Sequence, residues 1–409
     1  MPRATSHTTD PAVDAAALLR RLAFFGLTVV IPVTALVSRR SVVILAPIGI
    51  VLLIIAAALD GAQRPLATGL SRLGGARAIL AGALLLGWCA LSLVWTPFPG
   101  PASERLLNLA ATVGLTVAGY LALPDRMRSA NLYLLPLGVG AAAIGAVLLG
   151  LFSGAALRGG FEDDSALERG AMLLALLVWP AAAWLRSRRR DMEALGLAVV
   201  VALALVLAPG PVPLMALGVG AAAFALSAWR RNLGVRVTAG VAAGLVALAP
   251  LLPFLLRPLL TPVLGPLHPT VLSLKAWQRV VTSEPLRLIT GHGLETAIRG
   301  KVIGMLPINA PASLLFEIWY ELGIVGAFAA AFVLWNGIRH SGREHPVLTP
   351  GAMATAATAF ASACLGIGTT ASWWFTSVTV VVLVFIAAER GQFRTSRPKA
   401  SALPPRSAA

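Results

Sequence analysis

The sequence has little charge and almost no cysteine. Of its 409 residues only 12% are Asp, Glu, Lys or Arg, and 17 acidic residues stand against 33 basic ones. A soluble domain keeps about a quarter of its residues charged so that its surface stays wetted, which excludes a soluble globule of this length. The two cysteines, Cys89 and Cys364, lie singly inside apolar runs and therefore predict neither a disulfide nor a Cys-x-x-Cys site.

Long apolar runs take the place of the missing charge. Hydrophobic residues make up 57% of the chain, and the mean hydropathy is +0.82. A helix that crosses a membrane needs about 20 mostly apolar residues. The pattern predicts an all-α, polytopic membrane protein, with one membrane domain over 1–390 and a disordered cytoplasmic tail over 391–409. Twelve candidate spans lie near 22–38, 41–59, 78–96, 107–123, 131–153, 170–185, 195–208, 212–228, 235–256, 314–336, 350–367 and 369–388.

The basic residues orient these spans. With the N-terminus in the cytoplasm, 22 of the 33 Lys and Arg residues fall on cytoplasmic segments and 11 on the other side. Six of those 11 lie in one long loop, 257–313, which the positive-inside rule does not count. Both termini are therefore predicted to be cytoplasmic and this loop external. The basic residues lie mostly in short clusters between the apolar runs, where they orient helices against an anionic leaflet. The net charge of +16 therefore predicts no nucleic-acid partner.

Two external segments carry cations that hydropathy does not explain. Arg158 and Arg169 flank an acidic stretch before the sixth span, and a charge at the membrane edge needs a partner or a ligand. The alternative is that Arg169 snorkels and pairs with Glu168 or Asp164. The long loop holds six cations within about 45 residues, which suits an anionic headgroup or a pyrophosphate.

The same loop contains a candidate general base and a candidate helix. His292 stands between two glycines and titrates near neutral pH, so it can act as a base or be a turn residue without a role. Residues 272–281 have helical periodicity with a basic, aromatic-bearing face. In the tenth span, Glu317 and Glu321 share one helix face. Buried carboxylates are costly, so these two contact substrate or are bonded to Arg169 or to backbone amides.

These motifs resemble the O-antigen ligase and polymerase superfamily of bacterial inner-membrane proteins. The similar features are the Glu-Leu-Gly-Ile-Val-Gly stretch at 321–326, the preceding Gly-His-Gly at 291–293, and Arg169 followed by Trp179-Pro180. Twelve spans with a large periplasmic loop between the ninth and tenth match the layout of that superfamily as well. The likeness covers most of residues 20–390.

Members of this superfamily transfer an undecaprenyl-pyrophosphate-linked glycan to an acceptor sugar at the periplasmic face, without a metal, a nucleotide or another cofactor. The resemblance therefore implies a glycan polymerase or ligase, acting as an inverting glycosyltransferase. Its partners would be the lipid-linked glycan, an acceptor glycan or lipid, and membrane lipids. In this hypothesis His292 or Glu317 is the base, and the substrate contacts are Arg169, Arg279, Arg299, Lys275, Arg158 and Glu321.

The sequence departs from the family pattern at three places. The family has a His-Asn pair where this chain has Ala312-Ser313, so the usual catalytic histidine is absent. The Arg expected shortly before Trp277 is also missing, and Lys275 and Arg279 stand at a different spacing. A Ser-rich motif is replaced by Gly-Pro-Val-Pro at 210–213. An alternative is therefore a non-catalytic relative that binds lipid-linked glycan or scaffolds an assembly complex.

A second alternative, a transporter or flippase, requires polar residues deep within several spans. The mid-span positions here are almost entirely Ala, Leu, Val and Gly, and no internal repeat stands out. The sequence does not distinguish polymerase from ligase, nor does it indicate which glycan and acceptor are used.

The first prediction concerns orientation. In a background without Cys89 and Cys364, cysteine at His268 or Lys301 should react with a membrane-impermeant thiol reagent added to intact cells, because both positions are in the external loop. Cysteine at Arg189 should react only after the cells are permeabilised. The reverse labelling pattern would contradict the orientation.

Overall fold

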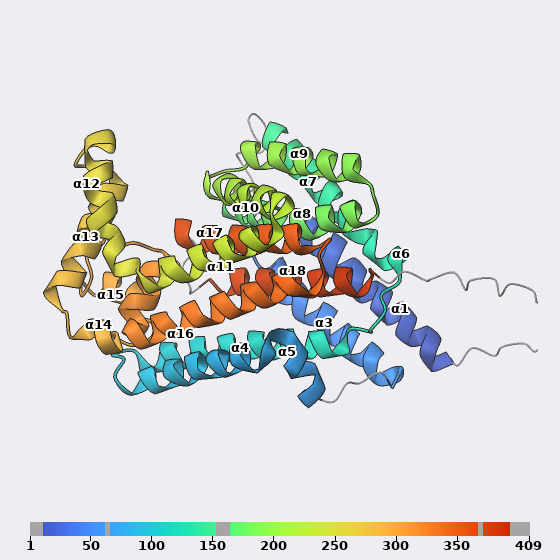
Figure 1. Cartoon of the computed structure of the whole chain (residues 1–409), viewed down its shortest axis with the longest axis horizontal. Coiled ribbons are helices and arrows are strands. Elements are labelled where there is room, and N and C mark those ends of the chain that lie inside the picture. Colours follow the sequence, from blue (N-terminus) through green and yellow to red (C-terminus); the bar gives the residue numbers. More distant parts are fainter. Residues whose placement is uncertain (1–10, 62–65, 153–163, 367–370, 393–409) are drawn as a thin grey trace, which may run out of the picture.

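The structure is a computed structural model in which all elements of the described residues are helices (Figure 1). It describes residues 11–61, 66–152, 164–366 and 371–392. The N-terminal half consists of α1 (Pro11–Phe25), η1 (Gly26–Val30), α2 (Ile31–Thr34), α3 (Ser41–Leu59), α4 (Leu66–Leu91), η2 (Ser92–Val94), α5 (Pro99–Ala122), α6 (Ser129–Leu132), α7 (Leu134–Phe152), α8 (Asp164–Ser187) and α9 (Asp191–Leu207). The C-terminal half consists of α10 (Val212–Trp229), α11 (Arg231–Ala247), η3 (Ala249–Leu251), α12 (Leu252–Leu264), α13 (Pro269–Ser283), α14 (Arg287–Thr290), α15 (Thr296–Val302), α16 (Leu314–Glu344), α17 (Thr349–Leu365) and α18 (Ser372–Arg390).

The lengths and composition of these helices show a membrane-embedded protein. Within the described ranges, eight helices are long and apolar enough to cross a membrane, and a bent pair makes a ninth if it counts as one span. Every segment predicted as a span contains helical residues. However, α4, α9, α11 and α17 do not individually meet both the length and the hydropathy that a span requires. Twelve crossings therefore stay a prediction.

The predicted ninth span, 235–256, is not one straight helix. Helix α11 ends at Ala247, and the chain turns by 68° through η3 into α12. Pro250 and Pro253 lie at the first turns of η3 and α12, where they lack the amide hydrogens that would continue α11. The bend places α12 across the end of the bundle, beside α13 (Figure 1).

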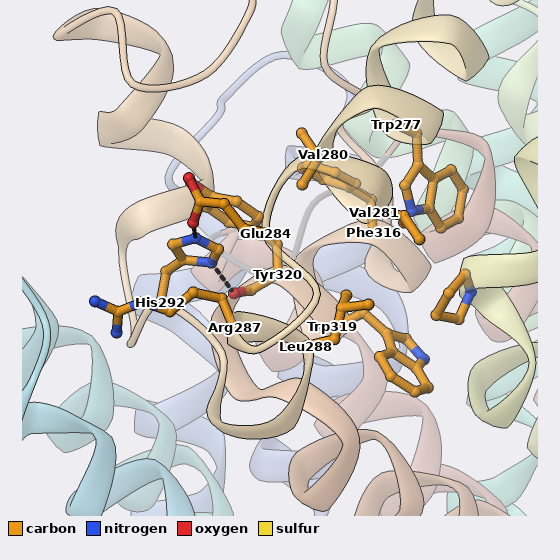
Figure 2. Close-up of a pocket in the computed structure, with 11 residues that line it drawn as sticks. Trp277, Val280, Val281, Glu284, Arg287, Leu288, His292, Phe316, Trp319 and Tyr320 are labelled. Carbon is orange, nitrogen blue, oxygen red and sulfur yellow. Dashed lines mark hydrogen bonds and ion pairs between the residues drawn. The ribbon is translucent and has the colours of Figure 1, made fainter.

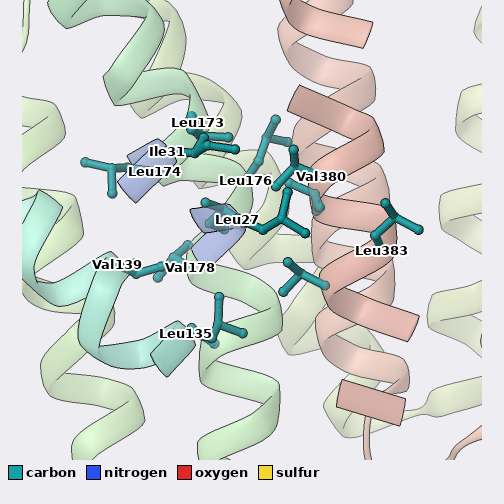
Figure 3. Close-up of a cluster of buried hydrophobic side chains, with 14 of the residues drawn as sticks. Leu27, Ile31, Leu135, Val139, Leu173, Leu174, Leu176, Val178, Val380 and Leu383 are labelled. Carbon is teal, nitrogen blue, oxygen red and sulfur yellow. The ribbon is translucent and has the colours of Figure 1, made fainter. Parts of the chain in front are cut away.

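Helix α8 is the centre of the larger hydrophobic core. Every residue from 170 to 185 is buried, which agrees with a helix that is apolar on all sides. Around it lie side chains of α1, η1, α2, α7 and α18 (Figure 3). Leu27 and Ile31 pack from the first span, and Val380 packs from α18.

A second core surrounds the N-terminal half of α16. It joins α16 to α4, α11, α13 and α15, and its largest side chains are Trp277, Trp319, Tyr320 and Phe316. The indole Nε1 of Trp319 donates a hydrogen bond of 2.6 Å to the carbonyl of Val246, at the end of α11. The segment predicted to be external, 257–313, is therefore anchored to the bundle by aromatic packing.

Hydrogen bonds between connecting segments tie distant parts of the chain together. The Arg231 guanidinium, at the start of α11, donates to the carbonyl of Gly342, near the end of α16, at 2.8 Å. Arg188, between α8 and α9, donates to the carbonyl of Gly391 at 2.8 Å, just after α18. All four segments fall on the predicted cytoplasmic side, so these contacts are compatible with the predicted orientation.

A second prediction follows from the crossing of α7 and the π-helix η1. A Cβ on Gly138 would overlap the Thr28 carbonyl and approach Val29 Cα to 2.7 Å, whereas a Cβ on Gly140 would meet only Leu197 at 3.7 Å. Gly138→Ala should therefore destabilise the protein by about 1–3 kcal/mol. Gly140→Ala, the control, should be neutral or slightly stabilising because alanine favours helix.

The measurement is the fraction of monodisperse protein that remains after heating in detergent. Equal melting of the two variants would contradict the close crossing.

Candidate functional site

The central feature of the site is a break in α16. Gly323 has φ 64° and ψ −160°, a non-helical conformation that kinks the helix at this point. Each of the three preceding carbonyls has a donor from another part of the chain. The carbonyl of Tyr320 accepts from His292 N at 2.8 Å, that of Glu321 from Gly293 N at 2.9 Å, and that of Leu322 from Trp88 Nε1 at 2.8 Å.

Glycines permit this close contact between two backbones. A Cβ on Gly323 would lie 2.5 Å from the carbonyl oxygen of Ile289 and 2.6 Å from Gly291 N. Gly291 and Gly293 have φ values of 74° and 94°, which L side chains rarely adopt. The Gly-His-Gly motif and the Glu-Leu-Gly motif are therefore one structural unit.

His292 is held on three sides in this unit (Figure 2). Its ring stacks on Tyr320 with centroids 4.0 Å apart, and Nδ1 lies 3.1 Å from the Tyr320 carbonyl oxygen. Its Nε2 lies 2.8 Å from Glu284 Oε2. Both ring nitrogens of His292 therefore have hydrogen-bond partners within the protein.

Glu284 is the more accessible member of this pair. Its side chain is 56% exposed, against 13% for His292. Glu284 was not predicted from the sequence, because it lies eight residues from His292 in a segment without a motif.

The cavity beside the pair is small. Glu284, Arg287, His292, Trp277 and Tyr320 are among its lining residues (Figure 2), and its volume is about 10 Å³. That is room for about one water molecule. The cavity is therefore closed in this structure.

A buried ionic network lies on the other side of the break. Arg105 of α5 donates from Nη1 to both carboxylate oxygens of Glu321, at 3.1 and 2.9 Å, and lies 3.5 Å from Glu295. Glu321 is 2% exposed and also accepts from Ala297 N at 3.2 Å. Arg299 extends the network through an ion pair with Glu295 at 3.3 Å. Glu321 is thus bonded to Arg105 and to a backbone amide, rather than to Arg169.

Glu317 lies one helical turn before Glu321. It is 2% exposed, so solvent and substrate have little access to it. Burial lowers the pKa of Lys301 in α15, while the nearby charge of Glu317 acts in the opposite direction. The Lys301 ammonium donates to the carbonyl of Pro311 at 3.3 Å. The N-terminal end of α16 therefore lies close to the charge of Lys301.

The other predicted cations lie apart from this network. Arg169 donates to the carbonyl of Arg39 at 3.4 Å, and its guanidinium lies 5.3 Å from the Trp373 ring centroid. Lys275 and Arg279 are exposed on α13, one helical turn apart. Arg158 lies outside the described residues.

Comparison with known proteins adds no assignment. No protein-family model matches the chain, and no curated protein matches it either. Among the described residues, no group of three His, Cys, Asp or Glu side chains could hold a metal ion.

A third prediction tests the ionic network. Arg105→Met removes the partner of a buried carboxylate and should cost about 3–5 kcal/mol, because the charge on Glu321 is left uncompensated. Arg105→Met combined with Glu321→Leu should recover most of this loss, since no charge is then left unpaired. Arg279→Met, at an exposed position, is the control and should melt like the wild type.

The measurement is the midpoint of thermal unfolding in detergent for the wild type, the two single variants and the double variant. A double variant as unstable as the single one would contradict the network.

Proposed function

We propose that the protein is a glycan polymerase or ligase of the bacterial inner membrane. Its donor would be an undecaprenyl-pyrophosphate-linked saccharide at the periplasmic face. The observation that carries this proposal is the carboxylate of Glu284, exposed at the outer end of the bundle and held 2.8 Å from His292. The motifs that resemble the O-antigen ligase superfamily support it, because Gly-His-Gly and Glu-Leu-Gly form the scaffold of this same site.

In the proposed reaction the acceptor hydroxyl oxygen attacks the anomeric carbon of the donor. The bond from that carbon to the pyrophosphate oxygen breaks with inversion, and the hydroxyl proton passes to Glu284. A carboxylate has this general-base role in inverting sugar chemistry. His292 is then a positioning residue: its ring orients the carboxylate, and its own orientation is fixed by Tyr320. Glu317 is a weaker candidate for the base, because it is buried.

The departing pyrophosphate needs cations. Arg287 lines the cavity beside Glu284, and the exposed Lys275 and Arg279 lie on the adjoining helix α13. Arg299 is 48% exposed on α15 and available from solvent. Charge-assisted hydrogen bonds from such groups stabilise the leaving phosphate oxygens. In the proposal Arg169 is a further contact of the lipid-linked donor at the membrane edge.

One alternative has specific support. The chain has Ala312-Ser313 where the family has His-Asn, both nitrogens of His292 are engaged, and the cavity holds about 10 Å³. These features favour a non-catalytic relative that binds lipid-linked glycan or scaffolds its assembly.

A fourth prediction distinguishes the two functions. Glu284→Gln keeps the shape of the side chain but removes the base, so the amount of polymer or ligated glycan should fall by about 10²–10⁴-fold. Glu193→Gln, at a similarly exposed carboxylate of α9, is the matched control and should leave the glycan profile unchanged. His292→Asn should lower activity less and should shift its pH profile, as expected of a positioning residue.

The measurements are glycan profiles of cells with equal amounts of each variant in the membrane. If neither Glu284→Gln nor His292→Asn alters the profile, the catalytic proposal is wrong and the non-catalytic alternative is favoured.

A further inference from the structure

A much larger cavity lies between the two hydrophobic cores. It separates α18, which belongs to the core around α8, from α16 and α17, and its volume is about 760 Å³. Sites for small molecules commonly have 300–1,000 Å³. This cavity is far larger than the one beside Glu284 and shares no lining residue with it.

The walls of the cavity are apolar and follow the helix axes. One face of α18 lines it from Trp374 to Arg390, with lining residues every three or four positions. Sixteen residues of helix rise about 24 Å, which is most of the ~30 Å hydrocarbon core of a bilayer. On α17 the facing positions are small, including Ala352, Ala356 and Ala359, which leaves the space open. A cavity of this length and polarity suits a hydrocarbon chain.

The charged lining residues gather at one end. This end is formed by the C-terminal ends of α16 and α18 and by the segment after α5. Two of the lining residues are acidic, Asp125 and Glu389, and three are basic, His340, His345 and Arg390. Glu389 and His345 are 2.9 Å apart. Arg390 donates to the Leu123 carbonyl at 2.6 Å, which fixes its guanidinium at this end.

We propose that this cavity binds a phospholipid with a zwitterionic, ethanolamine-type headgroup. The acyl chain lies along α17 and α18, and the phosphate meets the basic residues at the charged end. The ammonium group meets Asp125 and Glu389. An anionic headgroup such as that of phosphatidylglycerol has a phosphate for the basic residues but no cation for these two carboxylates, so the mixture of signs favours the zwitterion.

This lipid site is separate from the proposed catalytic site. The pyrophosphate-linked donor carries only negative charge in its headgroup, whereas the charged end here contains two carboxylates. The charged end also lies beside the segments that carry Arg188 and Gly391, on the side that the basic residues predict to be cytoplasmic. The lipid would therefore enter from the inner leaflet and fill the space between the two cores.

The test is native mass spectrometry of the full-length protein in mild detergent. Dioleoyl-phosphatidylethanolamine and dioleoyl-phosphatidylglycerol are added in separate titrations. We expect one tightly bound phosphatidylethanolamine, with an affinity about tenfold higher than that for phosphatidylglycerol. A tenfold difference in affinity corresponds to the free energy of about one charge-assisted hydrogen bond. Asp125→Asn combined with Glu389→Gln should abolish this preference. Equal binding of the two lipids to the wild type would overturn the proposal.

Filling the cavity provides a second arm. Ala356→Phe combined with Ala359→Phe places two rings inside the cavity and should remove the bound lipid. Ala222→Phe, on an exposed face of α10, is the control and should retain it. Retention of the lipid by a folded, filled variant would overturn the proposal.

If the variant with the filled cavity does not fold, lipid binding to the wild type is measured by tryptophan fluorescence instead. Phosphatidylethanolamine with brominated chains should quench part of the tryptophan emission of the wild type, and Trp374→Phe should remove that part. Quenching that is identical in Trp374→Phe would also overturn the site.

Discussion

Three hydrogen bonds join the turn of α16 before Gly323 to residues far from it in the sequence, and the arrangement of the segment predicted to be external depends on them. A helix broken inside an apolar environment leaves carbonyls without water to satisfy them, and this is tolerated only where other protein groups donate. His292, Gly293 and Trp88 supply those donors. By docking here, the 291–293 backbone also sets the ring of His292 against Tyr320 and brings Glu284 to the surface above it. The orientation of the accessible carboxylate thus depends on a break in a helix.

The same turn separates two kinds of electrostatic environment. On one side, Arg105, Glu321 and Glu295 are removed from solvent, where an ion pair holds its elements in register but gains little stability of its own. On the other side, Glu284 and Arg287 are exposed. The buried pair fixes α5, α15 and α16 relative to one another, while the exposed groups remain available for a ligand.

Apolar runs identified the helices, because burial in lipid requires them whatever the tertiary structure. The periodicity of residues 272–281 likewise predicted the helix α13. The predicted basic, aromatic-bearing face is wrong, because Trp277 is buried whereas Lys275 and Arg279 are exposed. The sequence did not indicate which residues far apart in the chain lie close together in the fold. Arg105 meets Glu321 across 216 residues, and nothing near Arg105 in the chain suggests that pairing. Glycine spacing does not reveal that Gly291 and Gly323 touch. Pro250 and Pro253 are local signals of the bend after Ala247. The predicted span 235–256 missed the bend because it was drawn from hydropathy alone.

Helix α8 meets no lipid once the protein is folded, since residues 170 to 185 are buried on every side. It nevertheless has to enter the bilayer before its neighbours enclose it, and at that stage each of its side chains faces hydrocarbon. Two different criteria therefore act on the same residues: transfer free energy during insertion, and fit between protein surfaces afterwards. Alanine and leucine meet both, because they are apolar and their shapes pack closely. A polar substitution would impair entry, and a bulky apolar one would insert well and then fail to pack.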